Sequence, residues 1–555
     1  MNKKILVAAA WPYANGSLHL GHVAGLIGAD ILARFQRLNG ADVLYVSGSD
    51  CHGTPISVEA EKQGVPPLEI AEKYHAEFVE TLIKGLNFSY DNYTNTLTEN
   101  HKQVVQEMFL NLYEKKLIYK KTEDLPYCPT CQRFLPDRYI EGTCPYCNFD
   151  PARGDQCDNC GKMLDAKELI KPRCKICGTK PEWRPSEHFF LKLSALAKDL
   201  KKWLGEEKGW RGNSYNFTKN LLASGLPDRA ITRDLDWGIE LPLPGYETKR
   251  IYVWFEAVCG YLSASKEWAA ETGRPDAWQE FWENKKAYHY YVHGKDNIPF
   301  HTIIWPAMLI GASDSKLAYN LPDMIVSSEY LTLEHKQFSK SRKWAVWLPD
   351  FLSRYQADTL RYYLIISGPE TSDADFSWQE FYLKTNNELI STFGNFVNRV
   401  FSLTEKNFPA GLNWPKKIDI SGQELLQLVK ETFKEAGASI EKANFREALR
   451  TIFRLIDEAN AYVNKTSPWL SLKRDKAKAE ADLAVLAFVV RSLAVLLYPY
   501  LPTTCESIAQ TLGFNLKETK WEYPNADFTK VGEFMPLFRK LSEAEITAEV
   551  ERLGK

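Results

Sequence analysis

Blocks of apolar residues alternate with amphipathic stretches over residues 1–117. Ile5–Ala10 is a short apolar run of the kind that forms a buried strand, and Val43–Val46 is a second one. Between them, Ser17 can cap a helix that runs to about Leu38. The apolar residues of that helix share one face: Val23, Ile27, Ile31 and Phe35. This alternation predicts a parallel sheet with helices on its faces.

The alternating pattern is interrupted over residues 118–225 and then resumes. The interrupting stretch holds most of the cysteines, many turn residues and little periodicity, so we expect an insertion. Three strand-like runs follow it: Ile251–Phe255, Tyr288–His293 and Met324–Ser327. The interrupted sheet predicts one nucleotide-binding α/β domain of the Rossmann type, split by the insertion.

From about Lys384 onward the apolar spacing is helical. Four segments have a period of about 3.6 residues: Asn386–Leu403, Gln423–Ala438, Phe445–Asn464 and Lys476–Tyr498. Phe408–Ile420, which is rich in Pro, Gly, Asn and Lys, is typical of a connector. The C-terminal part is therefore predicted to be an all-α bundle.

The composition of the chain mainly excludes some classes of protein. The 555-residue chain is 45% hydrophobic and 25% charged with a net charge of -2, which fits a multidomain globular protein that does not coat nucleic acid non-specifically. No run approaches ~18 apolar residues, so no membrane span is expected. Trp11, Pro12 and Tyr13 stand where a signal peptide would need small residues. We therefore expect a cytoplasmic protein.

The insertion contains four CxxC pairs. They are Cys128/Cys131, Cys144/Cys147, Cys157/Cys160 and Cys174/Cys177. A CxxC turn directs two thiolates at one ion and structural Zn²⁺ takes four, so these cysteines predict two structural zinc sites. The alternative, reduced cysteines packed as small apolar residues, does not explain four repeats of one spacing. Spacing alone leaves the pairing open.

A second motif, Trp11–His22, lies at a strand-to-helix turn, where α/β sheets bind their ligands. His19 and His22 share the first helical turn, where the helix dipole and free N–H groups suit a polyphosphate. Gly21 lacks a side chain, so a flat ligand can approach the backbone there. The alternative is a histidine pair that merely caps the helix, because short His/Gly patterns recur by chance.

A third feature is Phe338–Arg342, in which Lys340 stands between Ser339 and Ser341. A lysine flanked by hydroxyls on a mobile loop can follow the charge that develops on a leaving pyrophosphate. For five residues alone, a solvated basic turn is the better interpretation.

Taken together, HxGH near the start and SKS far downstream on a split α/β domain resemble the class I aminoacyl-tRNA synthetases. Further stretches are similar to the methionyl-tRNA synthetase family, over nearly the whole chain: Ala14–Gly16, Asp50–Pro55, Tyr252–Ala257, Gly294–His301 and Trp305–Ala307. The resemblance implies a ligase that activates L-methionine with ATP to methionyl-adenylate and pyrophosphate. It then transfers methionine to the 3′-terminal adenosine of tRNA(Met), initiator and elongator alike.

The resemblance implies His19, His22 and Lys340 as the catalytic residues. The first lysine of the family's KMSKS loop is replaced by Gln337, although Lys336 stands one position earlier, so Lys340 is the implied main phosphate-stabilising lysine. The chemistry mainly needs positioning and charge stabilisation, with Mg²⁺ accompanying ATP, and we nominate no general base. The implied ATP-binding residues are Asn15, Gly16, His19, Gly21, His22, Gly294, Lys295, Asp296, Phe338, Ser339 and Lys340.

The resemblance also implies a methionine pocket, with Asp50 holding the substrate ammonium. Aromatic walls suit a polarisable thioether, and the tips of Tyr and His side chains could offer the sulfur a weak hydrogen bond. For any one of these aromatics, ordinary core packing is the alternative. The implied methionine-binding residues are Trp11, Tyr13, Asp50, Trp254, Ala257, Val258, Tyr261 and His301.

For the tRNA, the implied anticodon-reading residues are Asn398, Pro468 and Trp469. A tryptophan beside a proline at a helix end can stack on a splayed base, although a buried bundle tryptophan is the alternative. The chain stops shortly after the bundle, without the extra C-terminal domain of many relatives, so we expect a monomer.

The family pattern pairs the inner two cysteine knuckles on one ion (Cys144, Cys147, Cys157 and Cys160) and the outer two on the other (Cys128, Cys131, Cys174 and Cys177).

The expected domain boundaries follow from pattern and resemblance together. Residues 1–117 and 226–325 form the two halves of the catalytic domain, and 118–225 form the zinc insertion. Residues 326–384 carry the KMSKS loop and a stem-contact region, and 385–555 form the anticodon-binding bundle.

Three rival functions remain to be weighed. A class I synthetase for leucine, valine or cysteine is disfavoured, because the pocket residues differ and no large editing insert is present. A non-enzymatic zinc-ribbon RNA-binding protein would be favoured by loss of His19, His22 or Lys340, and all three are present. A nucleotidyltransferase that makes a small-molecule adenylate would not need the helical bundle.

Overall fold

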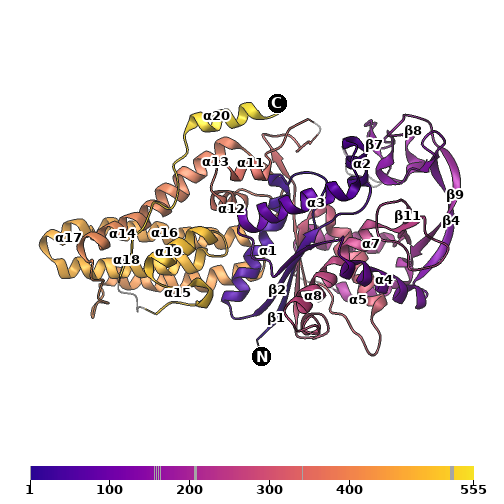
Figure 1. Cartoon of the computed structure of the whole chain (residues 1–555). Coiled ribbons are helices and arrows are strands. Elements are labelled where there is room, and N and C mark those ends of the chain that lie inside the picture. Colours follow the sequence, from indigo (N-terminus) through magenta and orange to yellow (C-terminus); the bar gives the residue numbers. More distant parts are fainter. Residues whose placement is uncertain are drawn as a thin grey trace.

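The computed structural model describes residues 2–154, 157, 159–160, 162, 164–205, 209–340, 342–525 and 530–555. Figure 1 shows an elongated molecule with an α/β part on the right and a helical bundle on the left. The insertion forms the right-hand end of the α/β part, and helix α20 runs back from the bundle toward it.

A five-stranded parallel sheet forms the centre of the α/β part. Its strand order is β14-β13-β1-β2-β3, with all neighbours parallel. The bounds are β1 (Lys4–Ala9), β2 (Asp42–Ser49), β3 (Asn92–Asn95), β13 (Tyr288–Gly294) and β14 (Met324–Ser328). The chain leaves β1 toward β2, while β13 pairs with its other side, so the carboxyl ends of β1 and β13 flank a topological switch point.

Helices cover the sheet on its faces, as the alternating pattern predicts. Helix α1 packs on β1, β2, β13 and β14, and α8 packs on β2 and β3. The helices of this part are α1 (Leu20–Leu38), α2 (Thr54–Gln63), α3 (Pro67–Phe78), α4 (Glu99–Glu114), α7 (Val253–Val258), α8 (Gly260–Glu271), α9 (Gln279–Trp282) and α10 (Trp305–Ala312).

One predicted strand is wrong. The stretch Ile251–Phe255 contains only the last residue of a short strand, β12 (Lys249–Ile251), after which the chain turns at Tyr252 into α7. A short apolar run fits a strand and a buried helix equally well by periodicity, and here Val253, Phe255 and neighbouring residues are buried on a helix. The predicted strands Ile5–Ala10, Val43–Val46, Tyr288–His293 and Met324–Ser327 are confirmed to within a few residues at their ends.

The insertion is built on long antiparallel strands. Strand β4 pairs with β9 along almost its whole length, and the cysteine knuckles sit at the far end of this ladder. Its elements are β4 (Ile118–Cys128), β5 (Arg133–Phe134), β6 (Ile140–Thr143), β7 (Ala152–Arg153), β8 (Ile170–Cys174), β9 (Glu182–Leu191), α5 (Leu193–Leu204) and α6 (Gly212–Ser224). Two short strands follow it, β10 (Arg229–Ala230), which pairs with β9, and β11 (Thr232–Asp234).

The C-terminal part is a helical bundle around α18, which is buried almost all round from Asp482 to Leu497. Short elements link it to the sheet: β15 (Leu331–Leu333), α11 (Leu348–Leu352), α12 (Ala357–Ile366), β16 (Ala374–Phe376) and α13 (Trp378–Lys384). A π-helical segment, Thr385–Gly394, then leads into α14 (Asn395–Asn407), α15 (Ile420–Glu441), α16 (Phe445–Thr466), α17 (Pro468–Arg474), α18 (Lys476–Leu497), α19 (Pro502–Leu512) and α20 (Glu543–Arg552).

A buried arginine fixes the bundle to the helix that carries the two histidines. Arg361 on α12 is fully buried and forms an ion pair with Asp30 of α1 at 2.7 Å. The same guanidinium donates to the backbone carbonyls of Pro499 and Tyr500, between α18 and α19, at 2.9 and 2.8 Å. A buried charge requires this degree of pairing, so the contact fixes the position of α1 relative to the bundle.

Candidate active site

The turn between β1 and α1 carries the two histidines of the HxGH motif. His19 is the extended N-cap residue of α1, and its backbone N–H donates to Nδ1 of His22 at 3.0 Å. The predicted cap by Ser17 is wrong, since the Ser17 hydroxyl donates to the Glu77 carboxylate and the helix begins at Leu20. Backbone pairing of this segment with the chain around Trp347 keeps it extended through His19.

Both imidazoles are held in the neutral form. Burial, together with the charge of Lys340, lowers the pKa of His22 to about 3. Burial, His22 and Lys340 also lower the pKa of His19 well below its ordinary value. At physiological pH these rings therefore act as hydrogen-bonding groups beside the partial positive charge of the α1 N-terminus.

The loop of residues 334–344, here called the Lys340 loop, packs onto this turn. Phe338 stacks on the ring of His19, with centroids 4.5 Å apart and planes within 6°. Two backbone hydrogen bonds of 2.9 Å between Ser339 and Trp344 hold the loop as a hairpin. Ser341 lies outside the described residues. The loop therefore brings Phe338 and Lys340 against the HxGH turn, as the motif pair predicts.

Lys340 reaches the start of the HxGH motif. Its ammonium donates to Oδ1 of Asn15 at 3.3 Å, and a Cβ on Gly16 would come within 2.6 Å of Nζ. Partial loss of hydration lowers the pKa of Lys340, an effect that the nearby Arg138 increases and Glu59 opposes. An exposed ammonium beside the α1 N-terminus is placed to bind an anion such as a phosphate.

Lys336 has a different environment from Lys340. Its ammonium lies over the ring of Trp344, 4.2 Å from the centroid, on the Lys340 loop itself. It is thus engaged in a cation–π contact, while Lys340 lies against Asn15 and Gly16.

The carboxyl ends of β13 and β14 complete this side of the site. A Cβ on Gly25 of α1 would lie 3.4 Å from the backbone nitrogen of Gly294, so helix and strand end are in close contact. The Asp296 carboxylate accepts a hydrogen bond from the Tyr330 hydroxyl. The Lys295 ammonium forms ion pairs of 2.7 Å with both Glu329 and Asp373. Its charge is therefore already compensated within the protein.

The predicted methionine-pocket aromatics are brought together, although they come from distant parts of the chain. Trp254 donates from Nε1 to the Tyr13 hydroxyl at 2.9 Å, and its ring contacts Phe300. The Tyr261 hydroxyl donates to Nε2 of His301 at 2.7 Å, because the other ring nitrogen of His301 is bonded to the carbonyl of Asn297.

This pairing changes one detail of the sequence prediction. Burial lowers the pKa of His301 to about 4, so the ring is neutral and both its nitrogens are engaged. The hydroxyl proton of Tyr261 is used by His301, so neither polar tip is free to donate to a substrate sulfur. The rings themselves remain available for contact with a thioether.

Trp11 is more tightly packed than a simple pocket wall. A Cβ added to Gly48 or to Gly260 would come within 2.6 and 2.7 Å of the indole. Glycine is therefore needed on both sides of this ring. Ala257 is half-buried and Val258 is buried on the same helix, α7, as Trp254.

Asp50 lies at the end of β2, beside Tyr13, and is nearly fully buried. The backbone N–H of His52 donates to its carboxylate at 3.3 Å. Burial, together with the charge of Glu256, raises the pKa of Asp50 well above its usual range. A buried carboxyl in this state gains most from a ligand that brings a positive charge.

The eight knuckle cysteines form two four-sulfur clusters. The outer cluster has Sγ–Sγ distances of 3.4 Å (Cys128 to Cys177) and 3.9 Å (Cys131 to Cys174). The inner one has 3.9 Å (Cys144 to Cys160) and 3.6 Å (Cys147 to Cys157). Four thiolates around one tetrahedral Zn²⁺ would be about 3.8 Å apart. Both clusters could hold a metal ion, and they have the pairing that the family pattern implies.

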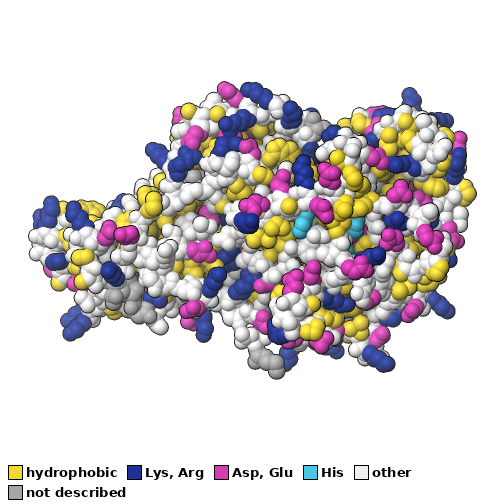
Figure 2. All heavy atoms as spheres, in the orientation of Figure 1, with side chains coloured by type: hydrophobic (Ala, Val, Ile, Leu, Met, Phe, Trp, Pro, Cys, Tyr) yellow, Lys and Arg dark blue, Asp and Glu magenta, His cyan; other side chains and the backbone are white. Residues whose placement is uncertain are grey.

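The three residues predicted to read an anticodon lie on the bundle. Asn398 is exposed on α14, and Pro468 opens α17 after Ser467, whose left-handed conformation (φ 44°) ends α16. Trp469 is 37% exposed, so it is not the buried bundle tryptophan of the alternative. Lysine and arginine side chains gather around this tip, at the left of the molecule where α17 lies (Figures 1 and 2).

A large cavity lies between the insertion and the α7 side of the site. It has a volume of about 440 Å³ and is lined by Trp254 and Phe300 and by residues of β4 and β9. Its charged lining is mixed, with the basic residues Lys121, Arg229 and Arg233 and the acidic residues Glu123, Asp165, Asp228 and Asp234. The volume is that of a small-molecule site, and the cavity opens beside the Trp254 wall.

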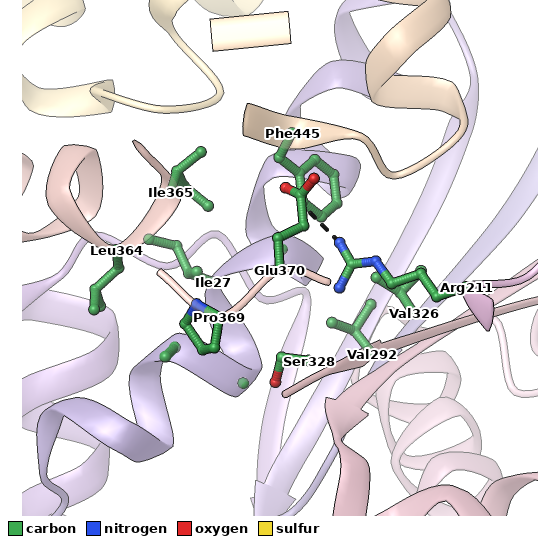
Figure 3. Close-up of a pocket in the computed structure, with 13 residues that line it drawn as sticks. Ile27, Arg211, Val292, Val326, Ser328, Leu364, Ile365, Pro369, Glu370 and Phe445 are labelled. Carbon is green, nitrogen blue, oxygen red and sulfur yellow. Dashed lines mark ion pairs between the residues drawn. The ribbon is translucent and has the colours of Figure 1, made fainter. Parts of the chain in front are cut away.

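A much smaller pocket, of about 20 Å³, lies at the carboxyl ends of β13 and β14 and has room for a single water molecule. Figure 3 shows Arg211, from the insertion, pointing toward Glu370, beside Phe445 at the start of α16. Arg211 donates to the carbonyls of Ser327 (3.1 Å) and Ala443 (2.8 Å). This pocket is a junction of insertion, sheet and bundle and is too small for a nucleotide.

Two charged residues near the site have no role in the sequence analysis. Arg211 gave no signal, because its partners are carbonyls far away in the chain. Glu256 does have a signal in the sequence, because it is a lone carboxylate in the apolar stretch Val253–Val258, next to predicted pocket residues.

Comparison with known proteins covers the whole chain. A model of class I tRNA synthetases (M) matches residues 5–401, and a model of the anticodon binding domain of methionyl tRNA ligase matches residues 414–550. A methionine–tRNA ligase of Dehalococcoides mccartyi is 50% identical over 561 residues, covering 100% of both chains. One of Bacillus cereus is 46% identical over 552 residues, covering 99% of both.

A solved structure has the same fold. The Mycobacterium tuberculosis methionyl-tRNA synthetase in complex with methionyl-adenylate superposes with a TM-score of 0.79 at 24% identity, covering 97% of this chain and 99% of that one. Within the part of the chain that the structure describes, no helix is both long and apolar enough to cross a membrane.

Proposed function

The chain belongs to the methionyl-tRNA synthetase family of class I aminoacyl-tRNA synthetases, and from this we propose how its residues perform the reaction. The enzyme activates methionine with ATP and transfers it to tRNA. The observation that carries the residue assignment is the contact of Lys340 with Asn15 and Gly16 beside the neutral His19.

In the first step, the methionine carboxylate attacks the α-phosphate of Mg²⁺–ATP and pyrophosphate leaves. We assign Asp50 to the substrate ammonium and Tyr13, Trp254, Ala257, Tyr261 and His301 to the side chain, with Trp11 and Val258 as packing behind it. Fixed orientation of the two reactants supplies much of the rate enhancement in such displacements.

The phosphates lie, in this proposal, between the α1 N-terminus and the Lys340 loop. His19 and His22 donate or accept hydrogen bonds as neutral rings, and Lys340 follows the charge that develops on the departing pyrophosphate. Gly294 and Asp296 face the ribose and base side. Lys295 acts through its ion pairs with Glu329 and Asp373, which hold that strand end in place.

In the second step, the terminal ribose hydroxyl of tRNA attacks the carbonyl of methionyl-adenylate and AMP leaves. The bundle, residues 385–555, reads the anticodon through Asn398, Pro468 and Trp469, in initiator and elongator tRNA(Met) alike.

Residues 1–117 and 226–325 carry the chemistry, 118–225 carry the metal sites, and 326–384 join them to the bundle. We also propose that the enzyme acts as a monomer in the cytoplasm, where its free cysteines stay reduced.

The activity is tested by ATP–pyrophosphate exchange with each of the twenty amino acids. We expect exchange with methionine alone, because the aromatic wall and Asp50 together suit an unbranched, polarisable side chain on an α-amino acid. Exchange with another amino acid would refute the pocket assignment but keep the class. No exchange at all with intact, metal-loaded protein would favour an RNA-binding protein.

We further propose that each cysteine cluster binds one Zn²⁺, which ties the knuckles together without an open coordination position. Metal analysis of the purified protein is expected to give about two zinc ions per chain, and Cys177→Ser should reduce this to about one. Cys505→Ser, at a buried cysteine outside the insertion, is the control and should leave both ions bound. A single zinc per unmodified chain would contradict the proposal.

A further inference from the structure

A second carboxylate, Glu256, is buried beside the methionine pocket. It lies on α7 between Trp254 and Ala257, and its exposure is 0%. An ionised carboxylate in a protein interior is costly unless other groups compensate it, so its surroundings decide its role.

The partners of Glu256 are two histidines. Its Oε1 is 2.5 Å from Nδ1 of His52 and 3.7 Å from Nε2 of His101. The Ser263 hydroxyl donates to the backbone carbonyl of Gly260, so Nδ1 of His101 is the donor to Ser263. The second oxygen, Oε2, has no hydrogen-bond partner among the described residues.

One residue connects Glu256 to Asp50. The ring of His52 contacts the Glu256 carboxylate, and its backbone N–H donates to Asp50. Within the described part of the chain, no lysine or arginine forms an ion pair with either carboxylate. The titratable groups around the pair are His52 and Cys51 after β2, His101 on α4, Cys259 before α8 and Tyr13 after β1.

The two carboxyl groups respond to this setting in opposite ways. Burial alone would raise the pKa of Glu256, but the neighbouring imidazoles of His52 and His101 hold it below its usual value. Glu256 is therefore the ionised member of the pair. Its charge, added to burial, keeps the pKa of Asp50 high until a cation enters.

We propose that Glu256 is a positioning residue for the substrate: with His52 it orients Asp50 and adds a second negative charge that makes the pocket require an α-ammonium group. This inference rests on the proposed methionine-activating function. It assigns the requirement for the ammonium to two carboxylates from different elements, where the sequence resemblance implies one.

The test is ATP–pyrophosphate exchange as a function of pH, with Glu256→Gln, Glu256→Asp and the unmodified enzyme. Asp50 must be ionised to hold the ammonium, so the KM for methionine should rise as pH falls through the raised pKa of Asp50. In Glu256→Gln the like charge is gone, so this inflection should move to lower pH. Above the inflection, loss of the second charge should raise KM about tenfold, with kcat nearly unchanged.

The Glu256→Asp variant keeps the charge and should keep the inflection near its original pH. A methionine analogue without the amino group should inhibit Glu256→Gln more strongly, relative to the affinity for methionine, than it inhibits the unmodified enzyme. An inflection that does not move in Glu256→Gln would overturn the inference and leave Glu256 a structural residue. If Glu256→Gln does not fold, the pH dependence of the unmodified enzyme still tests the inference. A KM for methionine that shows no inflection on the acid side would also overturn the inference. Absence of any methionine-dependent exchange would instead refute the proposed function.

Discussion

Replacing Lys340 by alanine is expected to lower kcat for ATP–pyrophosphate exchange by about 10²–10³-fold, with little change in the KM for methionine. The ammonium is the cation that the Lys340 loop holds against Asn15 and Gly16. A polyphosphate bound there would bring its negative charge next to this cation. Negative charge on the leaving pyrophosphate is greatest in the transition state, so the loss should appear mainly in kcat.

The matched control is Lys336→Ala on the same loop. That side chain lies over Trp344, so its removal should cost only a few-fold in kcat through loss of a surface cation–π contact. Circular dichroism and thermal unfolding should be unchanged for both variants. Equal losses in the two variants would mean that the loop needs its total charge rather than Lys340 in particular.

Replacing Trp469 by alanine is expected to lower kcat/KM for aminoacylation of tRNA(Met) strongly while leaving methionine-dependent exchange nearly intact. Stacking of an aromatic side chain on an unpaired base is worth about 1–3 kcal/mol, which corresponds to roughly 5- to 150-fold. Trp469 is exposed at the start of α17, on the bundle tip distant from the sheet (Figure 1). Its loss should therefore weaken tRNA binding without disturbing the adenylate site.

Leu470→Ala is the matched control, because Leu470 is the next residue on α17 and is exposed to a similar degree. It should change aminoacylation little. A short RNA that carries only the acceptor stem should be charged equally by Trp469→Ala and by the unmodified enzyme. Parallel loss of aminoacylation and exchange in Trp469→Ala would show that this tryptophan is structural.

Much of the architecture could be predicted from the sequence, for a physical reason. Strands such as Tyr288–His293 are buried on both faces and therefore appear in the sequence as continuous apolar runs. The long helices bury one face, so their apolar residues recur about every 3.6 positions. The two cysteine clusters could be predicted because a CxxC turn is a local structure. Local rules fail where the neighbours are distant: pairing with the chain near Trp347 moves the start of α1 to Leu20, and Val253–Val258 forms a helix in place of the expected strand.

The properties of the candidate site also fall into those that the sequence determines and those that depend on the tertiary structure. The sequence by itself determined which groups are present: two histidines at a helix N-terminus, Lys340 between hydroxyls, Asp50 after a strand and eight paired cysteines. Only the tertiary structure decided their state. It stacks Phe338 on His19, commits Tyr261 to His301, and sets Glu256 against His52 across 204 positions of chain. Charge and hydration depend on spatial neighbours, and residue spacing along the chain does not reveal those neighbours.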